Sequence, residues 1–335
     1  MLRGLSNDLA IDLGTTNTVV YARKRGIVVS EPSTVARNRD GVVTVGSAAE
    51  AMAGRTPRGI EVVHPIRKRV VTDFDLAARL LEGVMALPGA SRGFLRPRVV
   101  MPVSATLSSV ESRAARESAQ VAGAREVHLV PQSICGAIGV GLPAFEPAGN
   151  MIIDIGGGGT EVSVISLGEV TIVESTPVGG EALDQAIIRY LRTYYGLQIG
   201  ARTAEQIKCN VESCCQVGSN AVFTVKGQDV VRGTPAAIEL KSDEVVSALG
   251  ESIAAIIEVV RTAFLNTPAE LAGDLFDRGG VVIGGGAKLP GLDQQLREST
   301  GLPVFVAESA EQAVVMGAGQ ILETPAVLNK LTLRS

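Results

Sequence analysis

Two segments of the chain carry the same pattern of residues that could hold a metal-bound phosphate. Residues 9–22 read LAIDLGTTNTVVYA and residues 151–165 read MIIDIGGGGTEVSVI, so Asp12 and Asp154 stand at equivalent positions. In each copy an apolar run leads to Asp, then to Gly and small residues, which predicts a strand, a tight turn and a second strand. Such a turn lets backbone N–H groups approach an anion, and an Asp entering it can hold a divalent cation through water.

The duplication separates this site from an ordinary hairpin. A single Asp-x-Gly turn is as often a plain glycine-rich hairpin, whereas a repeated one indicates architecture. The repeat also extends further, because the strand, turn and helix expected over 98–123 match those expected over 280–299. We therefore expect two half-domains that close on one metal-bound polyphosphate.

Strand and helix signals alternate along the chain and predict an α/β fold. Ser108 and Glu111 predict a capping box for a helix that runs to Gly123, and Ser242 is expected to cap a long helix with an apolar stripe. The segment 201–241 is polar and irregular, without an obvious core of its own, and is interpreted as a small inserted subdomain.

The composition argues against several classes of protein. The 335 residues are 46% hydrophobic with a net charge of −4, which disfavours nucleic acid as the main partner because phosphate backbones require a basic surface. We expect no secretory leader in the polar start MLRGLSND, and no run of about 18 apolar residues could span a membrane. The cysteines lack the spacing of a zinc site and are expected to be reduced thiols: Cys135, Cys209, Cys214 and Cys215.

These motifs resemble those of a known superfamily. Residues 12–18 resemble the first phosphate loop of actin, DnaK-type chaperones and sugar kinases, residues 154–161 the second phosphate loop, and residues 284–287 the adenosine motif. Over nearly its whole length the chain is similar to the MreB-type bacterial actins. The similar blocks are GIVVSEPS at 26–33, GRTP at 54–57, PRVV at 97–100, AGAREVHL at 122–129, EVSVISLG at 161–168, RTAEQIK at 202–208 and DRGGVVIGGGAKLPGL at 277–292.

The resemblance implies an actin-like ATPase fold, with two duplicated sheet-plus-helix lobes around a cleft for ATP and Mg²⁺. Asp12 and Asp154 would flank Mg²⁺ through its water shell. Glu205 and Lys208 would contact the ribose or adenine, although from the residues alone they form a solvated ion pair on one helix. The residues implied in phosphate binding are Gly14, Thr15, Thr16 and Asn17 with Gly156, Gly157, Gly158, Gly159 and Thr160, and those under the base are Gly284, Gly285, Gly286 and Ala287.

The same resemblance implies four parts for the chain. The first lobe would have its core in 1–32, 70–148 and 319–335 and its small subdomain in 33–69. The second lobe would have its core in 149–180 and 242–318 and its small subdomain in 181–241.

Three positions depart from the family pattern and bear on hydrolysis. Gln132-Ser133 stands where these proteins usually carry Glu-Pro, and a Gln can orient the attacking water but cannot take its proton. Gly159 replaces a Thr, and Gly180-Glu181 replaces Gly-Asp. We expect Gln132, together with the aspartates of the two phosphate loops, to support slow ATP hydrolysis.

An apolar pair in a basic surround is a candidate membrane contact. Phe94 and Leu95 stand among three arginines, a composition that suits an anionic headgroup layer. The alternative is that the pair packs at the start of the strand expected over 98–101. Residues 1–5 are expected to add a weak second contact. The arginines are Arg92, Arg96 and Arg98.

The function implied is that of an ATP-dependent bacterial actin that assembles head to tail into filaments. It would lie in the cytoplasm at the inner face of the plasma membrane and organise cell-wall synthesis and rod shape. Its partners would be further copies of itself, a transmembrane adaptor and the wall elongation machinery. A non-polymerising regulatory paralogue is the main alternative. A sugar kinase would need a catalytic Asp and larger insertions, and a DnaK-type chaperone would need a substrate domain.

Overall fold

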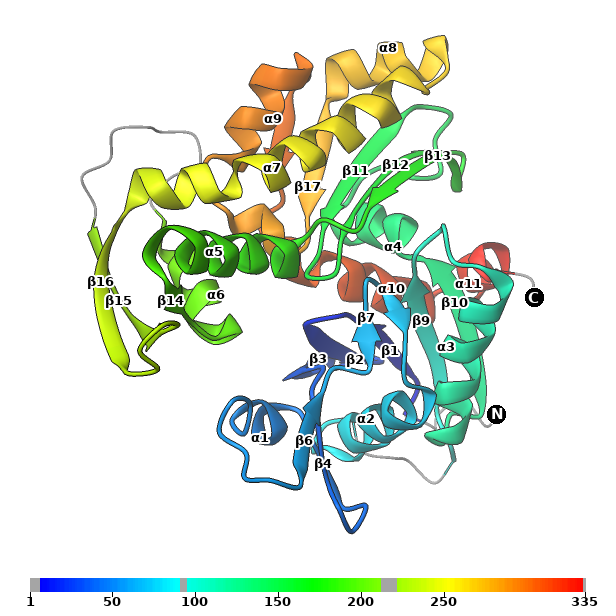
Figure 1. The fold of residues 1–335 in the computed structure, drawn as a ribbon. Helices are drawn as coiled ribbons and strands as arrows, with labels where there is room; N and C mark the ends of the chain where they lie inside the picture. Colours follow the sequence, from blue (N-terminus) through cyan, green and yellow to red (C-terminus); the bar gives the residue numbers. More distant parts are fainter. Residues whose placement is uncertain (1–6, 91–94, 212–221, 334–335) are drawn as a thin grey trace.

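A computed structural model describes residues 7–90, 95–211 and 222–333 and shows two lobes, each built on a five-stranded mixed sheet (Figure 1). The first sheet has the order β10-β9-β1-β2-β3 and the second β13-β12-β11-β17-β18. The first consists of β1 (Leu9–Leu13), β2 (Asn17–Ala22), β3 (Gly26–Pro32), β9 (Arg98–Val103) and β10 (Glu126–Pro131). The second consists of β11 (Asn150–Ile155), β12 (Thr160–Ser166), β13 (Glu169–Thr176), β17 (Gly280–Ile283) and β18 (Val304–Val306).

The duplication predicted from the sequence holds down to the register of the strands. Asp12 on β1 lies opposite Val19 on β2, and Asp154 on β11 lies opposite Glu161 on β12. In both sheets the central strand pairs antiparallel with the strand that follows it and parallel with a strand from much later in its half. The two aspartates therefore end equivalent strands, and the α/β, actin-like architecture is confirmed.

Helices cover the outer faces of both sheets. In the first lobe these are α2 (Phe74–Ala86) and α3 (Ser109–Val121), and in the second α7 (Ser242–Leu265), α8 (Ala269–Arg278) and α9 (Leu292–Thr300). A further helix of the second lobe, α5 (Gly180–Tyr195), packs against α7. The capping box of α3 is confirmed, because the Ser108 N–H donates to the Glu111 carboxylate at 2.8 Å. The cap expected at Ser242 is wrong: Lys241 is the capping residue and its N–H donates to Glu244 at 2.9 Å.

The segment 201–241 is more regular than expected. It contains α6 (Ala201–Asn210) and the hairpin of β15 (Val222–Asp229) and β16 (Pro235–Lys241), which pairs with β14 (Leu197–Gln198). Its apolar side chains are separated by polar ones along the sequence. For this reason the sequence showed no sign of a hydrophobic core within this segment. Ala204, Ile207 and Leu240 are nevertheless buried, because they join the core of the second lobe instead of forming one of their own.

A smaller sheet and a short hairpin extend the first lobe. The sheet has the order β5-β4-β6, from β4 (Val35–Asn38), β5 (Val43–Val45) and β6 (Ile60–Val63), with α1 (Ser47–Glu50) beside it. The hairpin joins β7 (Ile66–Arg67) to β8 (Val70–Val71). In Figure 1, β7 lies in the middle of the molecule, on the side of the first lobe that faces the second. The part boundaries given above stay predictions.

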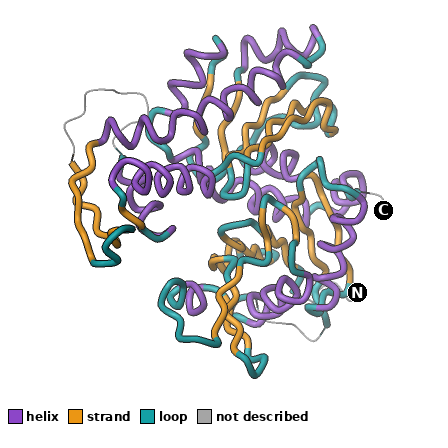
Figure 2. Tube along the Cα trace, viewed as in Figure 1, coloured by secondary structure: helices purple, strands orange, loops and turns teal. Residues whose placement is uncertain are grey.

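Two helices cross between the sheets, α4 (Gln132–Gly139) and α10 (Ala313–Glu323), followed by α11 (Pro325–Leu331) (Figure 2). They touch backbone to backbone. A Cβ on Gly139 would lie 1.9 Å from the Ala313 carbonyl oxygen, and one on Gly317 would lie 1.8 Å from the Cys135 carbonyl oxygen. An apolar cluster continues from one lobe to the other around this crossing, with Val100 on one side and Ile152, Ile283 on the other.

The glycine contacts predict a large effect of a single methyl group. Gly139→Ala should lower the free energy of unfolding by about 3 kcal/mol, because α4 and α10 would have to separate. Urea unfolding of the unliganded chain measures this. Gly250→Ala on α7 is the matched control: its Cβ meets nothing within 4 Å, so it should raise the free energy of unfolding by about 0.5–1 kcal/mol. Equal stabilities of the two variants would contradict the backbone packing.

Candidate functional site

The first predicted phosphate loop has a fixed shape. The Gly14 N–H donates to the Asn17 carbonyl at 3.0 Å, and the Ser33 hydroxyl donates to the Gly14 carbonyl at 2.7 Å. Ser33 also hydrogen-bonds with the Thr18 hydroxyl at 2.8 Å, and both side chains are fully buried. The turn that follows Asp12 is thus held by hydrogen bonds from the neighbouring strands.

The second predicted phosphate loop repeats the turn and is tied to a helix. The Gly156 N–H donates to the Gly159 carbonyl at 3.0 Å, as in the first loop. The carbonyls of Gly156 and Gly157 accept the N–H groups of Gly180 and Glu181 at 3.0 and 2.9 Å. The first turn of α5 therefore binds the loop backbone, which satisfies two of the N–H groups that a helix start leaves unpaired.

The two loops face each other in contact across the cleft. A Cβ on Gly157 would lie 2.0 Å from the Thr16 hydroxyl, and one on Gly158 would lie 2.3 Å from the Thr15 hydroxyl. Asn17 lies beside them at the start of β2, and the Thr160 hydroxyl donates to the Val178 carbonyl at 2.8 Å. The lobes come this close because positions 157 and 158 carry no side chain.

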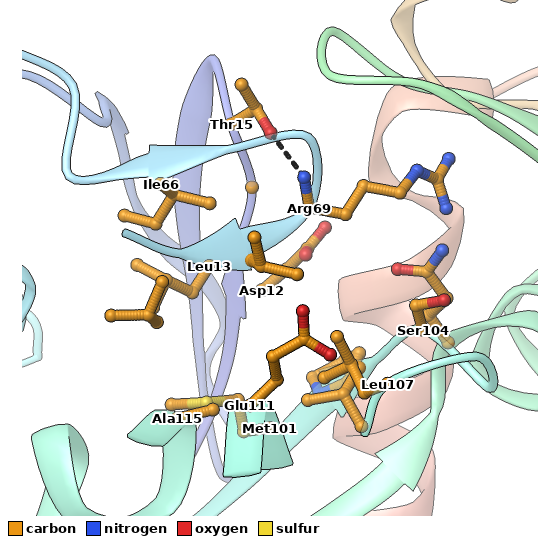
Figure 3. A pocket seen from close by; sticks show the side chains of 16 residues that line it. Asp12, Leu13, Thr15, Ile66, Arg69, Met101, Ser104, Leu107, Glu111 and Ala115 are labelled. Atoms are coloured by element: carbon orange, nitrogen blue, oxygen red, sulfur yellow. Dashed lines mark hydrogen bonds between the residues drawn. The ribbon is translucent and has the colours of Figure 1, made fainter. Parts of the chain in front are cut away.

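A pocket lies next to the first loop (Figure 3). Asp12, Thr15 and Gln132 line it, and its volume is about 50 Å³, which is room for a few water molecules. Gln132 and Asp12 thus line the same pocket, and the role of Gln132 in orienting water stays a prediction.

The two aspartates of the loops interact electrostatically. Burial, with the charge of Asp154 as the second cause, raises the pKa of Asp12 to about 7, and Arg69 opposes the rise. Two carboxylates that disfavour each other's charge are stabilised by a cation between them. No group of three or more metal-ligating side chains occurs within residues 7–90, 95–211 and 222–333. The pair fits Mg²⁺, which keeps several waters and takes only one or two carboxylates.

Arg69 is a residue of this site that the sequence reasoning missed. It stands with Lys68 at the tip of the β7–β8 hairpin, and both have positive φ, 70° and 49°. Two-residue hairpin turns of this type favour Asn-Gly, and a left-handed backbone costs other residues about 1–2 kcal/mol each. The Arg69 Nη2 donates to the carbonyls of Asp154 and Gly159 at 2.8 and 3.1 Å. Only a run of three basic residues, Arg67 to Arg69, between Ile66 and Val70 marks this position in the sequence.

Glu161 is a second residue to which the sequence reasoning gave no role. Its side chain is 1% exposed, and burial raises the pKa of its carboxyl. The Ser104 hydroxyl donates to it, and the Arg69 Nη1 lies 3.8 Å from its Oε2. Gln132 lies close enough to stabilise its charge. The predicted water-orienting amide therefore lies beside a buried polar cluster that crosses the cleft, and its Nε2 has no hydrogen-bond partner among the described residues.

The predicted adenosine motif packs behind the second loop. Gly284 begins the turn with φ 83°, and a Cβ on it would lie 2.6 Å from the Asp154 carboxylate. A Cβ on Gly286 would lie 2.2 Å from the Ile155 side chain. Residues 285–288 form a short 3-10 helix that contains the buried Ala287. The structure thus brings the third motif to the same end of β11 as the second loop.

Comparison with known proteins agrees with this geometry. The chain matches the MreB/Mbl protein family over residues 6–330. The chain belongs to the MreB/Mbl family. It is 44% identical to the cell shape-determining protein MreB of Escherichia coli (strain K12), covering 96% of this chain and 95% of the relative. It is 38% identical to the cell shape-determining protein Mbl of Bacillus subtilis (strain 168), covering 98% and 99%.

Solved structures of the MreB/Mbl type show the same fold. MreB5 of Spiroplasma citri bound to AMPPNP superposes with a TM-score of 0.90 at 30% identity, covering 96% of this chain and 97% of that one. The same protein bound to ADP superposes with a TM-score of 0.89. The duplicated sheets described above are therefore those of an actin-like protein.

In this MreB/Mbl chain the ion pair that the residues alone suggested between Glu205 and Lys208 does not form, and their contact with the ribose or adenine stays a prediction. Lys208 does not pair with Glu205, which is exposed on α6. Its ammonium lies 2.9 Å from Asp184 on α5 and donates to the Gly180 carbonyl at 3.3 Å. Burial, opposed by Lys208, raises the pKa of Asp184 to about 6. Asp184 was missed because its partner lies on another helix.

The candidate membrane pair of this MreB/Mbl chain is placed only in part. Phe94 and residues 1–5 lie outside the described residues, and Leu95 is half-buried. Arg98, expected in the basic surround, instead pairs with the buried Asp8 at 3.0 Å with 13% of its side chain exposed. Arg96 is exposed. The expectation that Arg98 belongs to the basic surround of the apolar pair is wrong, because its guanidinium balances the buried carboxylate of Asp8 at the start of β9.

The Lys208–Asp184 pair predicts a pH-dependent loss of stability. Asp184 has a higher pKa in the folded chain than its usual 3.8, so the free energy of unfolding falls as pH rises from about 4 to about 6. Lys208→Met should lower it by about 2–3 kcal/mol at pH 8, where Asp184 is charged and unpaired, and by less than half of that at pH 5, where Asp184 takes a proton.

Urea unfolding of the unliganded chain at both pH values measures this difference. Lys288→Met is the control, because its ion pair with Glu311 is exposed and should contribute less than about 0.5 kcal/mol at either pH. An equal loss at pH 5 and pH 8 for Lys208→Met would show that the pair does not control the ionisation of Asp184.

Proposed function

We propose that this chain is a nucleotide-dependent bacterial actin that binds ATP with Mg²⁺ between its lobes and hydrolyses it slowly. The observation that carries the proposal is the contact of two equivalent glycine-rich loops, each preceded by an aspartate, at the facing edges of the two sheets. The related MreB5 structures hold AMPPNP and ADP, which supports the same class of ligand here.

In this proposal each loop has a distinct task. The backbone N–H groups of residues 14–17 and 156–160 bind the β- and γ-phosphates, as glycine-rich turns bind anions elsewhere. Asp12 and Asp154 hold Mg²⁺ through its water shell, and the metal supplies neutralisation of phosphate charge during hydrolysis. Gln132 orients the attacking water from the pocket that it shares with Asp12. Lys208 lies beside the second loop, where it can reach the ribose, and Glu205 is exposed on the same helix.

We further propose that the chain forms filaments at the inner face of the plasma membrane and organises cell-wall synthesis and rod shape. The support is family membership, since the curated relatives are cell shape-determining proteins. A transmembrane adaptor and the wall elongation machinery are the proposed partners. Among the described helices none is both long and apolar enough to cross a membrane. We propose the apolar pair Phe94 and Leu95, which stands among arginines in the sequence, as the membrane contact.

Electron microscopy of the purified chain with ATP on anionic lipid tests this function. We expect filaments on the lipid surface with ATP and none without nucleotide. Phe94→Ser combined with Leu95→Ser should leave filaments in solution and weaken their binding to liposomes. A buried apolar side chain contributes about 1.5–3 kcal/mol, and a filament multiplies a loss per subunit through avidity.

The nucleotide-binding, filament and lipid-binding measurements each have an outcome that would contradict one part of the proposal. Nucleotide binding without filaments would favour the non-polymerising paralogue. Filaments of the double variant that bind lipid like the parent would remove the apolar pair as the membrane contact. If the double variant does not fold, the pair packs at the start of β9 instead.

The role of Gln132 predicts an order of hydrolysis rates. Gln132→Ala should slow phosphate release from filaments by about tenfold, less than the 10²–10⁴ typical of a general base, because orientation of water alone is lost. Gln132→Glu should speed it, because a carboxylate can take the proton. Gln120→Ala on the exposed face of α3 removes the same amide elsewhere and should change nothing. Release from Gln132→Ala at the parental rate would place the attacking water away from this residue.

A further inference from the structure

We propose that Arg69 binds the terminal phosphate of the nucleotide and thereby makes the cleft distinguish a nucleoside triphosphate from a diphosphate. This inference rests on the proposed function, since it assigns a further residue to the same nucleotide site. The position of Arg69 carries it. The backbone of this residue is fixed to one phosphate loop, and its guanidinium is fixed to the other.

The contacts of Arg69 place it where the loops meet. Its N–H donates to the Thr15 hydroxyl at 3.2 Å, the bond drawn in Figure 3. Its Nη2 donates to the carbonyls of Asp154 and Gly159 in the second loop at 2.8 and 3.1 Å. In Figure 3 the side chain extends from the hairpin tip away from Thr15. A phosphate gripped by both loops therefore lies within reach of this side chain.

The guanidinium has donors left over. Its Nε and Nη1 are buried, and neither has a hydrogen-bond partner among the described residues. An arginine has five N–H groups, of which Nη2 carries two, so the three on Nε and Nη1 lack an acceptor. Buried donors without acceptors are costly and rare in native proteins. A phosphate supplies several anionic oxygens, and arginine is the side chain best matched to them.

The charges around Arg69 point to the same ligand. The Nη2 lies 3.3 Å from the Asp154 carboxylate and the Nη1 lies 3.8 Å from that of Glu161, while Asp12 also interacts with the guanidinium. One cation thus faces three carboxylates. Once Asp12 and Asp154 share a divalent cation, Arg69 is not needed to balance them, and its charge is available to a phosphate.

The backbone of the hairpin is strained in order to place this side chain. Lys68 and Arg69 both have positive φ, a conformation that persists in non-glycine residues only where the surroundings enforce it and that clusters at ligand sites. The tip is packed against the second loop, because a Cβ on Gly158 would lie 2.9 Å from the Lys68 backbone nitrogen. A solvated surface arginine would not need this arrangement.

Equilibrium binding of AMPPNP and of ADP, each with Mg²⁺, tests the inference on the full chain without hydrolysis. Calorimetry on the parent and on Arg69→Ala should show AMPPNP bound at least about tenfold more weakly by the variant, with ADP weakened by no more than about threefold. Arg69→Gln, which keeps most of the side-chain length, should behave in the same way and serves if the alanine variant does not fold. Arg37→Ala is the control, because this exposed arginine pairs with Glu61 at 2.9 Å on the same small subdomain, outside the pocket.

The outcomes separate the two proposals. A parent chain that binds neither nucleotide would overturn the proposed function, and the role of Arg69 with it. A parent that binds both, with variants whose ratio of AMPPNP to ADP affinity is unchanged, would overturn only the role of Arg69. Tighter binding of both nucleotides by Arg69→Ala would also overturn the role of Arg69, because it would show that the arginine merely holds the empty cleft closed. An Arg37→Ala variant with the Arg69→Ala phenotype would assign the effect to net charge and also overturn the inference.

Discussion

Contact of backbone against backbone at glycines is the constraint on which the rest of this structure depends. Gly139 and Gly317 let α4 and α10 cross without side chains between them, so the two sheets sit on one continuous core. Gly157 and Gly158 do the same between the two predicted phosphate loops. Because the strand order is duplicated, the same close approach that joins the lobes also turns the ends of β1 and β11 toward each other. Fold and site thus depend on the same absence of side chains.

Within that contact, electrostatics sets what the cleft can accept. Three carboxylates, those of Asp12, Asp154 and Glu161, share the guanidinium of Arg69. Burial raises the pKa of Asp12 and of Glu161, so full ionisation of the cluster is disfavoured without further positive charge. A cleft with this composition favours a ligand that brings a divalent cation together with phosphate oxygens. A neutral ligand would gain little binding free energy in this cleft, because it would not compensate the negative charge of the carboxylates.

The features that could be predicted from the sequence are local or repeated. The positions of the aspartates, the glycine turns and the strands on either side of them follow from a pattern that occurs twice, and the capping box of α3 follows from two residues three positions apart. The conformation of one strand, turn or helix cap depends mainly on residues that are neighbours in the sequence, so a local pattern is enough to predict it. The turns in segments 9–22 and 151–165 do come into contact in the structure, and their role as phosphate loops stays a prediction.

The features that could not be predicted join elements far apart in the chain. Arg69 reaches the second loop across 85 residues of sequence, and Lys208 pairs with Asp184 on a different helix instead of with Glu205 on its own. The apolar side chains of 201–241 looked sparse because they complete another element's core. In each case the partner is fixed by tertiary packing, which a single sequence read in windows does not contain.

The attachment of α5 to the second loop has a geometric consequence. The helix has 16 residues and is therefore roughly 24 Å long at about 1.5 Å per residue. Its first N–H groups bind the carbonyls of Gly156 and Gly157, and at its far end the Tyr195 hydroxyl donates to Glu244 at 2.6 Å, where α7 begins. A rigid rod of that length, tilted by about 5° at the loop, moves its other end by about 2 Å. A small rearrangement of the second loop is thereby magnified into a larger displacement at the far end of α5, beside the start of α7.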